Sequence, residues 1–448
     1  MDDGLFSLSF DGEMRADSGA LTQAAEDFGH VVADRPRAVL RPGSAADIAT
    51  VLRFASEQGI PVVPRGQGHS TYGQAQARDG IVIDMSALDR VSHPSEDHVI
   101  VEAGATWADV LRTTLRQGLT PPVLTDYLGL SVGGTLSVGG LGGTSHRYGA
   151  QTDTVLALDA VTADGRTRSC SPTESPELFR SLLAGLGQCG VITRATLRLV
   201  PAPARVRRYK LFYRDIDLLT ASQRVLMREG RFDHLQGQIL PGPQGFRFML
   251  DAATYYTPPA APDDRELTAD AGHEPGSEEI EDLSYWDFAD RLSDGEAELR
   301  RLGAWTHPHP WANLLLPNTT TDDFLARILT GLTPDDLGAA GLVLVYPLLT
   351  RRLATPLLRT PAETITFLVA ALRFPPPDPA TVRRMIADNR SWYEQARELG
   401  GVSYPIGTIP FTGDDWRHHH GAGHPAFLEL VDRFDPARIL GSGLVRES

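Results

Sequence analysis

Residues 61–74 read Pro-Val-Val-Pro-Arg-Gly-Gln-Gly-His-Ser-Thr-Tyr-Gly-Gln. A short β-branched run leads into a loop in which Gly66 and Gly68 stand two residues apart and His69 follows the second glycine. Such a loop turns successive backbone N–H groups inward and forms a concave nest for an anionic phosphate. Glycine is needed because a Cβ atom would block both positive φ angles and close approach of a ligand. The segment therefore predicts a phosphate-binding loop with a histidine at its edge, within reach of a cofactor ring.

Two further glycine-rich segments accompany this loop. Residues 125–143 read Thr-Asp-Tyr-Leu-Gly-Leu-Ser-Val-Gly-Gly-Thr-Leu-Ser-Val-Gly-Gly-Leu-Gly-Gly and hold three Gly-Gly pairs within eleven residues. Such a backbone packs closely against a flat or extended ligand, although a tight glycine-rich turn also explains the pattern. Residues 185–193, Gly-Leu-Gly-Gln-Cys-Gly-Val-Ile-Thr, lead into a strand and could seat an adenine ring.

The composition is that of an ordinary soluble protein. Its 448 residues are 42% hydrophobic and 22% charged, which suggests roughly two or three domains. A formal net charge of -15 and the lack of a basic block argue against nucleic acid and anionic membranes as partners. Two cysteines are too few for a disulfide framework. No run approaches the roughly 20 apolar residues of a membrane span, and residues 1–20 lack a secretory pattern, so we expect a cytoplasmic protein.

Helical and strand patterns alternate through residues 1–203 and predict an α+β domain. Residues 44–59 carry apolar side chains at i, i+3, i+4 and i+7 and end at a glycine, as a helix does. Helices are also expected after the caps Thr106 and Ser175. Strands are expected at 61–64, 81–84, 99–103, 154–161, 166–170 and 191–200.

The pattern changes after Pro203. Longer strands are expected at 208–213, 235–240, 246–255 and 342–348, with helices such as 321–332 between them. Residues 257–282 are rich in proline and acidic side chains and almost lack large apolar ones, so we expect an exposed loop or flap. Residues 416–440 return to helical character.

Taken together, the glycine-rich segments resemble those of a known family. Gly-X-Gly-His-Ser-X-X-Gly-Gln at 66–74, Thr-Asp-Tyr-Leu at 125–128 with Val-Gly-Gly-Thr-Leu-Ser at 132–137, and Gly-Leu-Gly-Gln-X-Gly-Val-Ile-Thr-Arg-Ala at 185–195 resemble the FAD-linked oxidases of the vanillyl-alcohol-oxidase type. Within that group the chain is most similar to the cytokinin dehydrogenases. The resemblance continues through segments at 281–285, 288–291, 308–314, 345–348 and 433–436, and so covers most of the chain.

The resemblance implies an α+β fold with two parts. A two-subdomain PCMH-type FAD-binding domain would comprise residues 1–203 and a C-terminal return at 405–448. A substrate-binding domain at 204–404 would hold an antiparallel sheet flanked by helices.

The resemblance also implies FAD joined to the protein through the ring of His69. The alternatives are a loop histidine that only hydrogen-bonds phosphate, or FAD held without a covalent bond. Related enzymes with two covalent links use a cysteine in the second glycine segment, and no cysteine occurs from Thr120 to Ser145, so a single link is expected. The residues expected around FAD are Gly66, Gln67, Gly68, Ser70 and Gln74 at the pyrophosphate, Ser131, Ser137 and Leu141 along its middle, Ile192 at the adenine and Tyr404 near the flavin. The tail departs from the family, because Gly441-Ser442-Gly443-Leu444 stands where the family has Ser-Pro-Gly-Gln.

Asp126 matches the catalytic aspartate of the family. The implied reaction moves a hydride from a C–H next to an amine nitrogen to flavin N5, while Asp126 accepts the proton, and the resulting imine hydrolyses to an amine and an aldehyde. Considered alone, Asp126 could equally belong to a turn or a helix cap. Oxygen or a quinone would then take the electrons from the flavin.

The substrate-binding residues implied by the resemblance are Gln236, Trp311 and Asn313. Gln236 replaces a glutamate of the family, and a neutral amide loses the charge-assisted contact to a purine that the glutamate would make. An alcohol or another specialised metabolite is therefore an alternative substrate, and a flavin-binding protein without turnover is a third interpretation. We expect no metal site: the histidines at 418–420 and 424 are more typical of a solvated turn. Residues 309–311 shape the substrate cavity or form a rigid core corner.

Overall fold

The computed structural model describes residues 4–338 and 340–441. Its first sheet has the order β1-β2-β4-β3, from β1 (Glu13–Arg15), β2 (Ala38–Arg41), β3 (Val62–Arg65) and β4 (Ile81–Asp84). Strands β2, β4 and β3 run parallel, because helix α2 (Ala45–Gln58) carries the chain back between two of them. The predicted apolar positions of α2 are buried, and the helix ends at Gly59 with φ of 64°.

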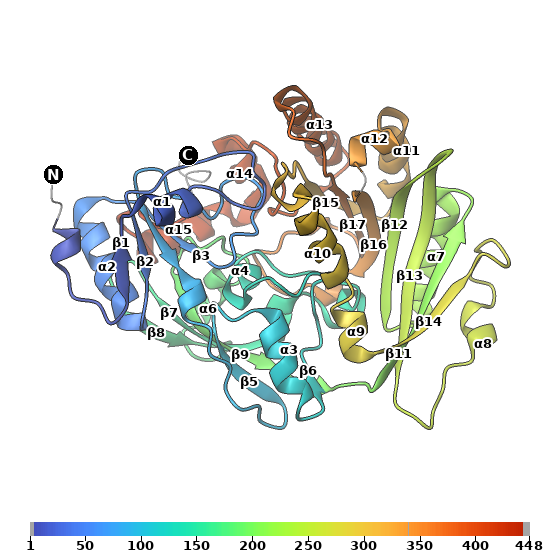
Figure 1. Ribbon diagram of the computed structural model, residues 1–448, viewed down its shortest axis with the longest axis horizontal. Helices are drawn as coiled ribbons and strands as arrows, with labels where there is room; N and C mark the ends of the chain where they lie inside the picture. Colours follow the sequence, from blue (N-terminus) through green and yellow to red (C-terminus); the bar gives the residue numbers. More distant parts are fainter. Residues whose placement is uncertain (1–3, 339, 442–448) are drawn as a thin grey trace.

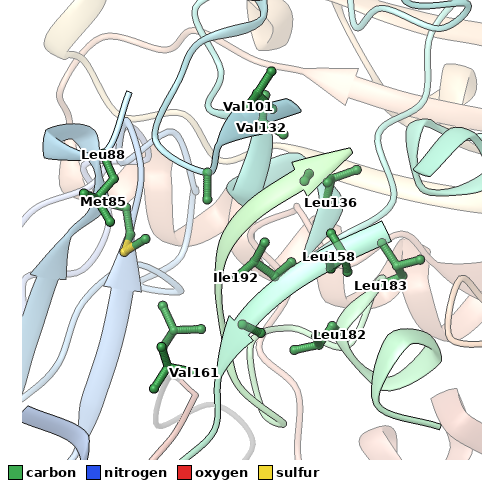
Figure 2. Packing of buried hydrophobic residues seen from close by; sticks show 14 of the residues in the cluster. Met85, Leu88, Val101, Val132, Leu136, Leu158, Val161, Leu182, Leu183 and Ile192 are labelled. Carbon is green, nitrogen blue, oxygen red and sulfur yellow. The ribbon is translucent and has the colours of Figure 1, made fainter. Parts of the chain in front are cut away.

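A second sheet, β5-β9-β7-β8, is antiparallel throughout. Its strands are β5 (His98–Glu102), β7 (Val155–Val161), β8 (Thr167–Cys170) and β9 (Val191–Arg198). The first two sheets share one apolar core, and Figure 2 shows Met85 and Leu88 on one side of it with Leu158 and Ile192 on the other. Helices of this part are α1 (Ser18–Ala24), α3 (Trp107–Leu115), α4 (Val132–Leu136), α5 (Ser145–Tyr148) and α6 (Pro176–Leu182), and a two-stranded pair joins β6 (Leu119–Thr120) to β10 (Val200–Pro201).

The third sheet is antiparallel, with the order β14-β11-β13-β12-β16-β17-β15-β18. It occupies the right-hand half of Figure 1. Its strands are β11 (Arg205–Tyr213), β12 (His234–Gly242), β13 (Gly245–Tyr256), β14 (Glu279–Ser284), β15 (Ala312–Pro317), β16 (Leu342–Leu349), β17 (Ile365–Leu372) and β18 (Val402–Ser403). The helices that follow or connect them are α7 (Ile216–Glu229), α8 (Asp264–Thr268), α9 (Tyr285–Ala289), α10 (Ser293–Arg301), α11 (Thr321–Gly331), α12 (Pro334–Leu337) and α13 (Pro379–Glu398).

The two faces of this sheet serve different cores. On β16, Val343 and Val345 pack with side chains of α7, α11 and α13, whereas Tyr346 and Leu348 belong to the cluster that includes Leu141 of the first part. Successive side chains of a strand point to opposite faces. One face is therefore covered by helices, and the other faces the first two sheets.

The C-terminal segment returns to the first part of the chain. Helices α14 (Gly413–His420) and α15 (His424–Phe434), red in Figure 1, lie beside the blue N-terminal elements. The backbone N–H of Val62 donates to the carbonyl of Ile439 at 2.8 Å, and that of Ala163 to Phe434 at 3.1 Å. These bonds join residues from opposite ends of the sequence.

Residues 257–282 are mostly exposed, as expected of a loop or flap, but part of the segment is regular structure, which was not expected. The segment contains α8, and β14 begins at Glu279 and pairs with β11. The acidic side chains of β14 face basic ones on β11: Asp282 pairs with Arg205, and Glu281 accepts from Lys210 at 2.6 Å. Cross-strand pairs of opposite charge stabilise a strand that has no apolar pattern of its own.

Across the described ranges 4–338 and 340–441, no helix combines the length and apolar character that a membrane crossing requires.

Candidate functional site

A cavity of about 380 Å³ lies where the third sheet meets the first two. Its wall takes residues from the loop after β3, from the 125–141 segment, from the start of β9, from β16 and β17, and from residues 403–411. The lining includes every site residue predicted above except Gln236: Gly66, Gln67, Gly68, His69, Ser70, Gln74, Asp126, Ser131, Ser137, Leu141, Ile192, Trp311, Asn313 and Tyr404. Segments far apart in the sequence thus converge on one space.

The loop at residues 65–74, here called the His69 loop, begins as β3 ends. Gly68 has φ of 67°, a left-handed conformation that favours glycine. Gly66 lies against the second glycine segment, because a Cβ atom there would stand 1.9 Å from Ser131 Oγ. The two segments can meet only because residue 66 has no side chain.

The Gly-Gly pairs serve two purposes. The pair at 133–134 lines the cavity, as expected of a backbone beside a ligand. The pair at 142–143 packs against protein instead, because a Cβ atom on Gly143 would stand 2.2 Å from the buried ring of His234. The pair at 133–134 therefore borders the cavity, whereas the pair at 142–143 allows close packing within the protein.

His69 sits in an aromatic stack at the cavity wall. Its ring lies 3.9 Å from that of Phe28 and 4.9 Å from that of Tyr127, measured between centroids. Burial, with smaller contributions from His309 and Arg300, lowers the pKa of His69 to about 3. The imidazole is therefore neutral near pH 7, and neither ring nitrogen hydrogen-bonds to another described residue.

Asp126 is held through both carboxylate oxygens. Arg291 Nη2 lies 2.5 Å from Oδ1, and the Gln236 amide nitrogen donates to Oδ2 at 2.8 Å. The Asp126 side chain is 21% exposed and that of Arg291 11%. The structure thus places Gln236 behind Asp126, buried, so that it reaches the cavity through the carboxylate.

Arg291 is the functional contact that sequence reasoning missed. Its segment is one of those that resemble the family, but nothing in the spacing pairs residues 165 positions apart. The stacking of Phe28 and Tyr127 around His69 was also missed, because the three residues lie on different loops and local sequence does not show that these loops meet.

Trp311 and Asn313 also line the cavity. Trp311 donates its indole N–H to the carbonyl of Arg373 at 3.2 Å. Asn313 is buried, and its side-chain nitrogen has no hydrogen-bond partner among the described residues. His309 does not line the cavity; its ring stacks on the far side of Phe28 at 3.8 Å.

The residues fit the FAD that the fold implies. The cavity is lined in part by glycine backbone at Gly66, Gly133 and Gly140. A Cβ atom there would stand 1.9, 2.8 and 2.1 Å from Ser131, Ala103 and Gln151, so glycine lets these segments pack closely around the space. Tyr404 accepts a hydrogen bond from the Gly140 N–H at 2.9 Å and so fixes the loop beside it. The unpartnered donor of Asn313 offers a hydrogen bond to a ligand. Gly441 also lines the cavity, whereas Ser442, Gly443 and Leu444 of the divergent tail lie outside the described residues.

The C-terminal histidines are not a solvated turn, contrary to expectation. His418 is exposed, but His419 and His420 are each 4% exposed and pack near Trp416. The reason is that α14 is amphipathic and buries one face. Among residues 4–338 and 340–441, no three or more His, Cys, Asp or Glu side chains are grouped so as to hold a metal ion.

Two family models match the chain. One, described as an FAD binding domain, matches residues 36–171, and the other, described as "Cytokinin dehydrogenase 1, FAD and cytokinin binding", matches residues 243–445. These ranges include the His69 loop and the strands β16 and β17, which line the cavity.

Curated relatives match over nearly the whole chain. An uncharacterized oxidoreductase of the fasciation locus of Rhodococcoides fascians is 42% identical, with 96% of this chain and 98% of the relative covered. Cytokinin dehydrogenase 7 of Oryza sativa subsp. japonica is 34% identical, covering 98% and 92%. Cytokinin dehydrogenase 10 of the same plant is 36% identical, covering 98% and 89%. The chain therefore belongs to the cytokinin dehydrogenase family of FAD-dependent oxidoreductases with a PCMH-type FAD-binding domain.

Proposed function

We propose that this FAD-dependent oxidoreductase oxidises a secondary amine at the C–H next to the nitrogen, with Asp126 accepting the N–H proton and FAD attached through His69. The observation that carries the proposal is the placement of Asp126. Its carboxylate lines the same cavity as His69, and Arg291 and Gln236 hold both of its oxygens. A general base must lie within hydrogen-bond reach of the proton that it removes, and such groups typically contribute about 10²–10⁴-fold in rate.

FAD, when bound, supplies the hydride acceptor at its N5 atom. The His69 loop would hold the pyrophosphate, Ser131, Ser137 and Leu141 the middle of the cofactor, and Ile192 the adenine. Tyr404 would lie near the flavin. The neutral ring of His69 supports a covalent bond, because only an unprotonated nitrogen can act as the nucleophile.

Trp311 and Asn313 are proposed to bind the substrate directly, and Gln236 to affect its binding indirectly. Trp311 and Asn313 would contact it at the cavity wall, whereas Gln236 would act through Asp126, to which its amide N–H is committed. An amine oxidation yields an imine, which water hydrolyses to an amine and an aldehyde. Oxygen or a quinone then takes up the electrons.

A second candidate, oxidation of an alcohol, is favoured by Gln236. This side chain is neutral and spends its N–H on Asp126, so it offers no charge-assisted bond to a purine. An alcohol needs only a base for its O–H, and Asp126 would serve equally.

The test mixes purified holoprotein, without oxygen, with isopentenyladenine or with vanillyl alcohol and follows bleaching of the visible flavin band. Isopentenyladenine is expected to bleach the wild type, and Asp126→Asn to slow this by about 10²-fold or more. Asp97→Asn, an exposed aspartate with an 81% exposed side chain, is the matched control and is expected to keep the wild-type rate.

Each of the other outcomes decides a different part of the proposal. Bleaching by the alcohol alone would establish the second candidate. No bleaching by either compound would support a flavin-binding protein without turnover. If Asp126→Asn bleached as fast as wild type, Asp126 would not be the proton acceptor.

A further inference from the structure

The carboxylate of Asp126 meets the cavity as one member of a fixed group of three side chains. Arg291 and Gln236 each take one of its oxygens, at 2.5 Å and 2.8 Å. An amide nitrogen facing a carboxylate oxygen can only donate, so the orientation of Gln236 follows from Asp126. Both contacts favour the charged form of the carboxylate.

Arg291 is itself immobilised on its other side. Its Nη1 donates to the carbonyl of Phe288 at 3.2 Å, and its guanidinium lies 4.8 Å from the centroid of the Phe288 ring. Because α9 ends at Ala289 and α10 begins at Ser293, the arginine is anchored in a short connection between two helices. Its geometry toward Asp126 therefore does not depend on a bound ligand.

The other titratable groups that face Asp126 come from the third sheet and are neutral. Burial lowers the pKa of His234 on β12 to about 4. Burial also raises the pKa of Tyr255 on β13 and of Tyr346 on β16 well above the ordinary value. Farther back, Asp251 is paired with Arg208 at 2.7 Å. The charge within hydrogen-bond distance of Asp126 is that of Arg291.

Gln236 completes the arrangement. An ionised carboxylate in its place could only accept hydrogen bonds, so it would need a proton in order to donate to Asp126. Two carboxylates at this distance would also repel each other, which opposes ionisation of both. The amide donates without a proton from solution. This position of the chain thus supplies a donor at every pH at which the fold persists.

We propose that Arg291 is the positioning residue of the proton acceptor and that, with Gln236, it holds the Asp126 carboxylate in one orientation beside a fixed positive charge before the substrate arrives. The inference rests on the proposed function, in which Asp126 takes the substrate proton. Its consequence is that the acidic limit of activity depends on Arg291, because a neighbouring guanidinium favours the charged form of a carboxylate. Neither residue needs to touch the substrate to exert this effect.

The experiment measures kcat/KM for flavin reduction by isopentenyladenine between pH 4 and pH 9. This range of about five pH units covers the displacement of the acidic limb of the profile that loss of an ion pair would cause. Arg291→Met is expected to move the acidic limb to higher pH by about 1–3 pH units, the displacement that a nearby arginine typically causes. Arg291→Lys keeps the charge and is expected to restore most of the wild-type profile. Gln236→Glu introduces a second carboxylate and is expected to move the limb in the same direction as Arg291→Met.

Arg224→Met is the matched control. Arg224 is 14% exposed, pairs with Asp322 at 2.9 Å and lies 4.8 Å over the ring of Phe367, so its contacts imitate those of Arg291 away from the cavity. It is expected to lower the melting temperature and to leave the acidic limb in place.

Two failures are distinguishable. If Asp126→Asn abolishes flavin reduction but Arg291→Met leaves the limb where it is, the positioning role is wrong and the proposed function stands. If Asp126→Asn reduces its flavin at the wild-type rate, the proposed function itself is wrong.

Discussion

His69 combines a neutral ring with a fixed position. Its pKa is lowered to about 3 because the ring is enclosed, and Phe28 holds it face to face at 3.9 Å. A loop histidine in water would be partly protonated near neutral pH and free to rotate. The glycines of the His69 loop allow this placement, because they let the backbone turn and approach Ser131 without collision.

At this scale we predict that wild-type protein precipitated in acid keeps its yellow colour and that His69→Ala releases all of it into the supernatant. The physical reason is that alanine has no nucleophile to bond the flavin. Absorbance of pellet and supernatant checks the prediction, and His98→Ala, a histidine outside the cavity lining, should retain the colour. Flavin that washes out of acid-treated wild type would contradict the covalent bond.

At the scale of one element, α14 carries two buried histidines, His419 and His420, whose pKa values burial lowers, so both rings are neutral near pH 7. Burial, with a smaller contribution from His424, lowers the pKa of His420 from 6.5 to about 4, and neither of its ring nitrogens has a hydrogen-bond partner among the described residues. The unfolded chain binds a proton at His420 below about pH 6.5, whereas the folded chain does not until about pH 4. Stability from this group is therefore complete above pH 6.5 and is lost as the pH falls toward 4.

We predict that His420→Phe weakens the acid sensitivity of the fold. Between pH 6.5 and pH 4, His420 should lower the free energy of unfolding by about 1.4 kcal/mol for each unit by which the pH falls. Phenylalanine can replace the ring, which lies 4.6 Å from that of Phe427, and takes up no proton. Unfolding free energies from urea titrations at several pH values check the slope. His418→Gln, on the exposed face of the same helix, should keep the wild-type slope, and equal slopes for all three proteins would refute the prediction.

At the scale of the whole molecule, the cavity takes its wall from both halves of the chain. The wall is formed by residues 63–75 and 125–141 together with residues 403–411. The backbone N–H of His309 also donates to the carbonyl of Gly29 at 2.8 Å. A ligand that fills this space touches both halves, so it should stabilise them together.

We predict that FAD raises the melting temperature of the His69→Ala protein, freed of flavin, in a single transition. A concentration about a hundred-fold above the dissociation constant should add about 2.7 kcal/mol. FMN at the same concentration is expected to add less, because it lacks the adenylate that would reach Ile192. Calorimetry checks this, and two transitions of which FAD moves only one would contradict it.

The features predicted from sequence are those that depend on short-range rules. The loop at 66–74 was recognisable because positive φ and close approach demand glycine at particular positions, and α2 because its apolar spacing is local. The flap at 257–282 was predicted in part wrongly, since β14 is stabilised by charges on β11 that local sequence does not reveal. His419 and His420 were misjudged because burial depends on Trp416 and on Phe427 of α15.

The sequence by itself pointed to the cofactor class, the α+β fold and the candidate residues, mainly through motifs that resemble those of a known family. Glycine requirements and periodicity within neighbouring positions added the phosphate-binding loop and several helices and strands. The tertiary structure decided how those residues act on one another. Only folding brings Arg291 to Asp126 across 165 positions, and only folding places the amide of Gln236 against the same carboxylate. The physical reason is that charge pairing and burial depend on distance in space, and no pattern along the chain encodes the distance between two segments that far apart.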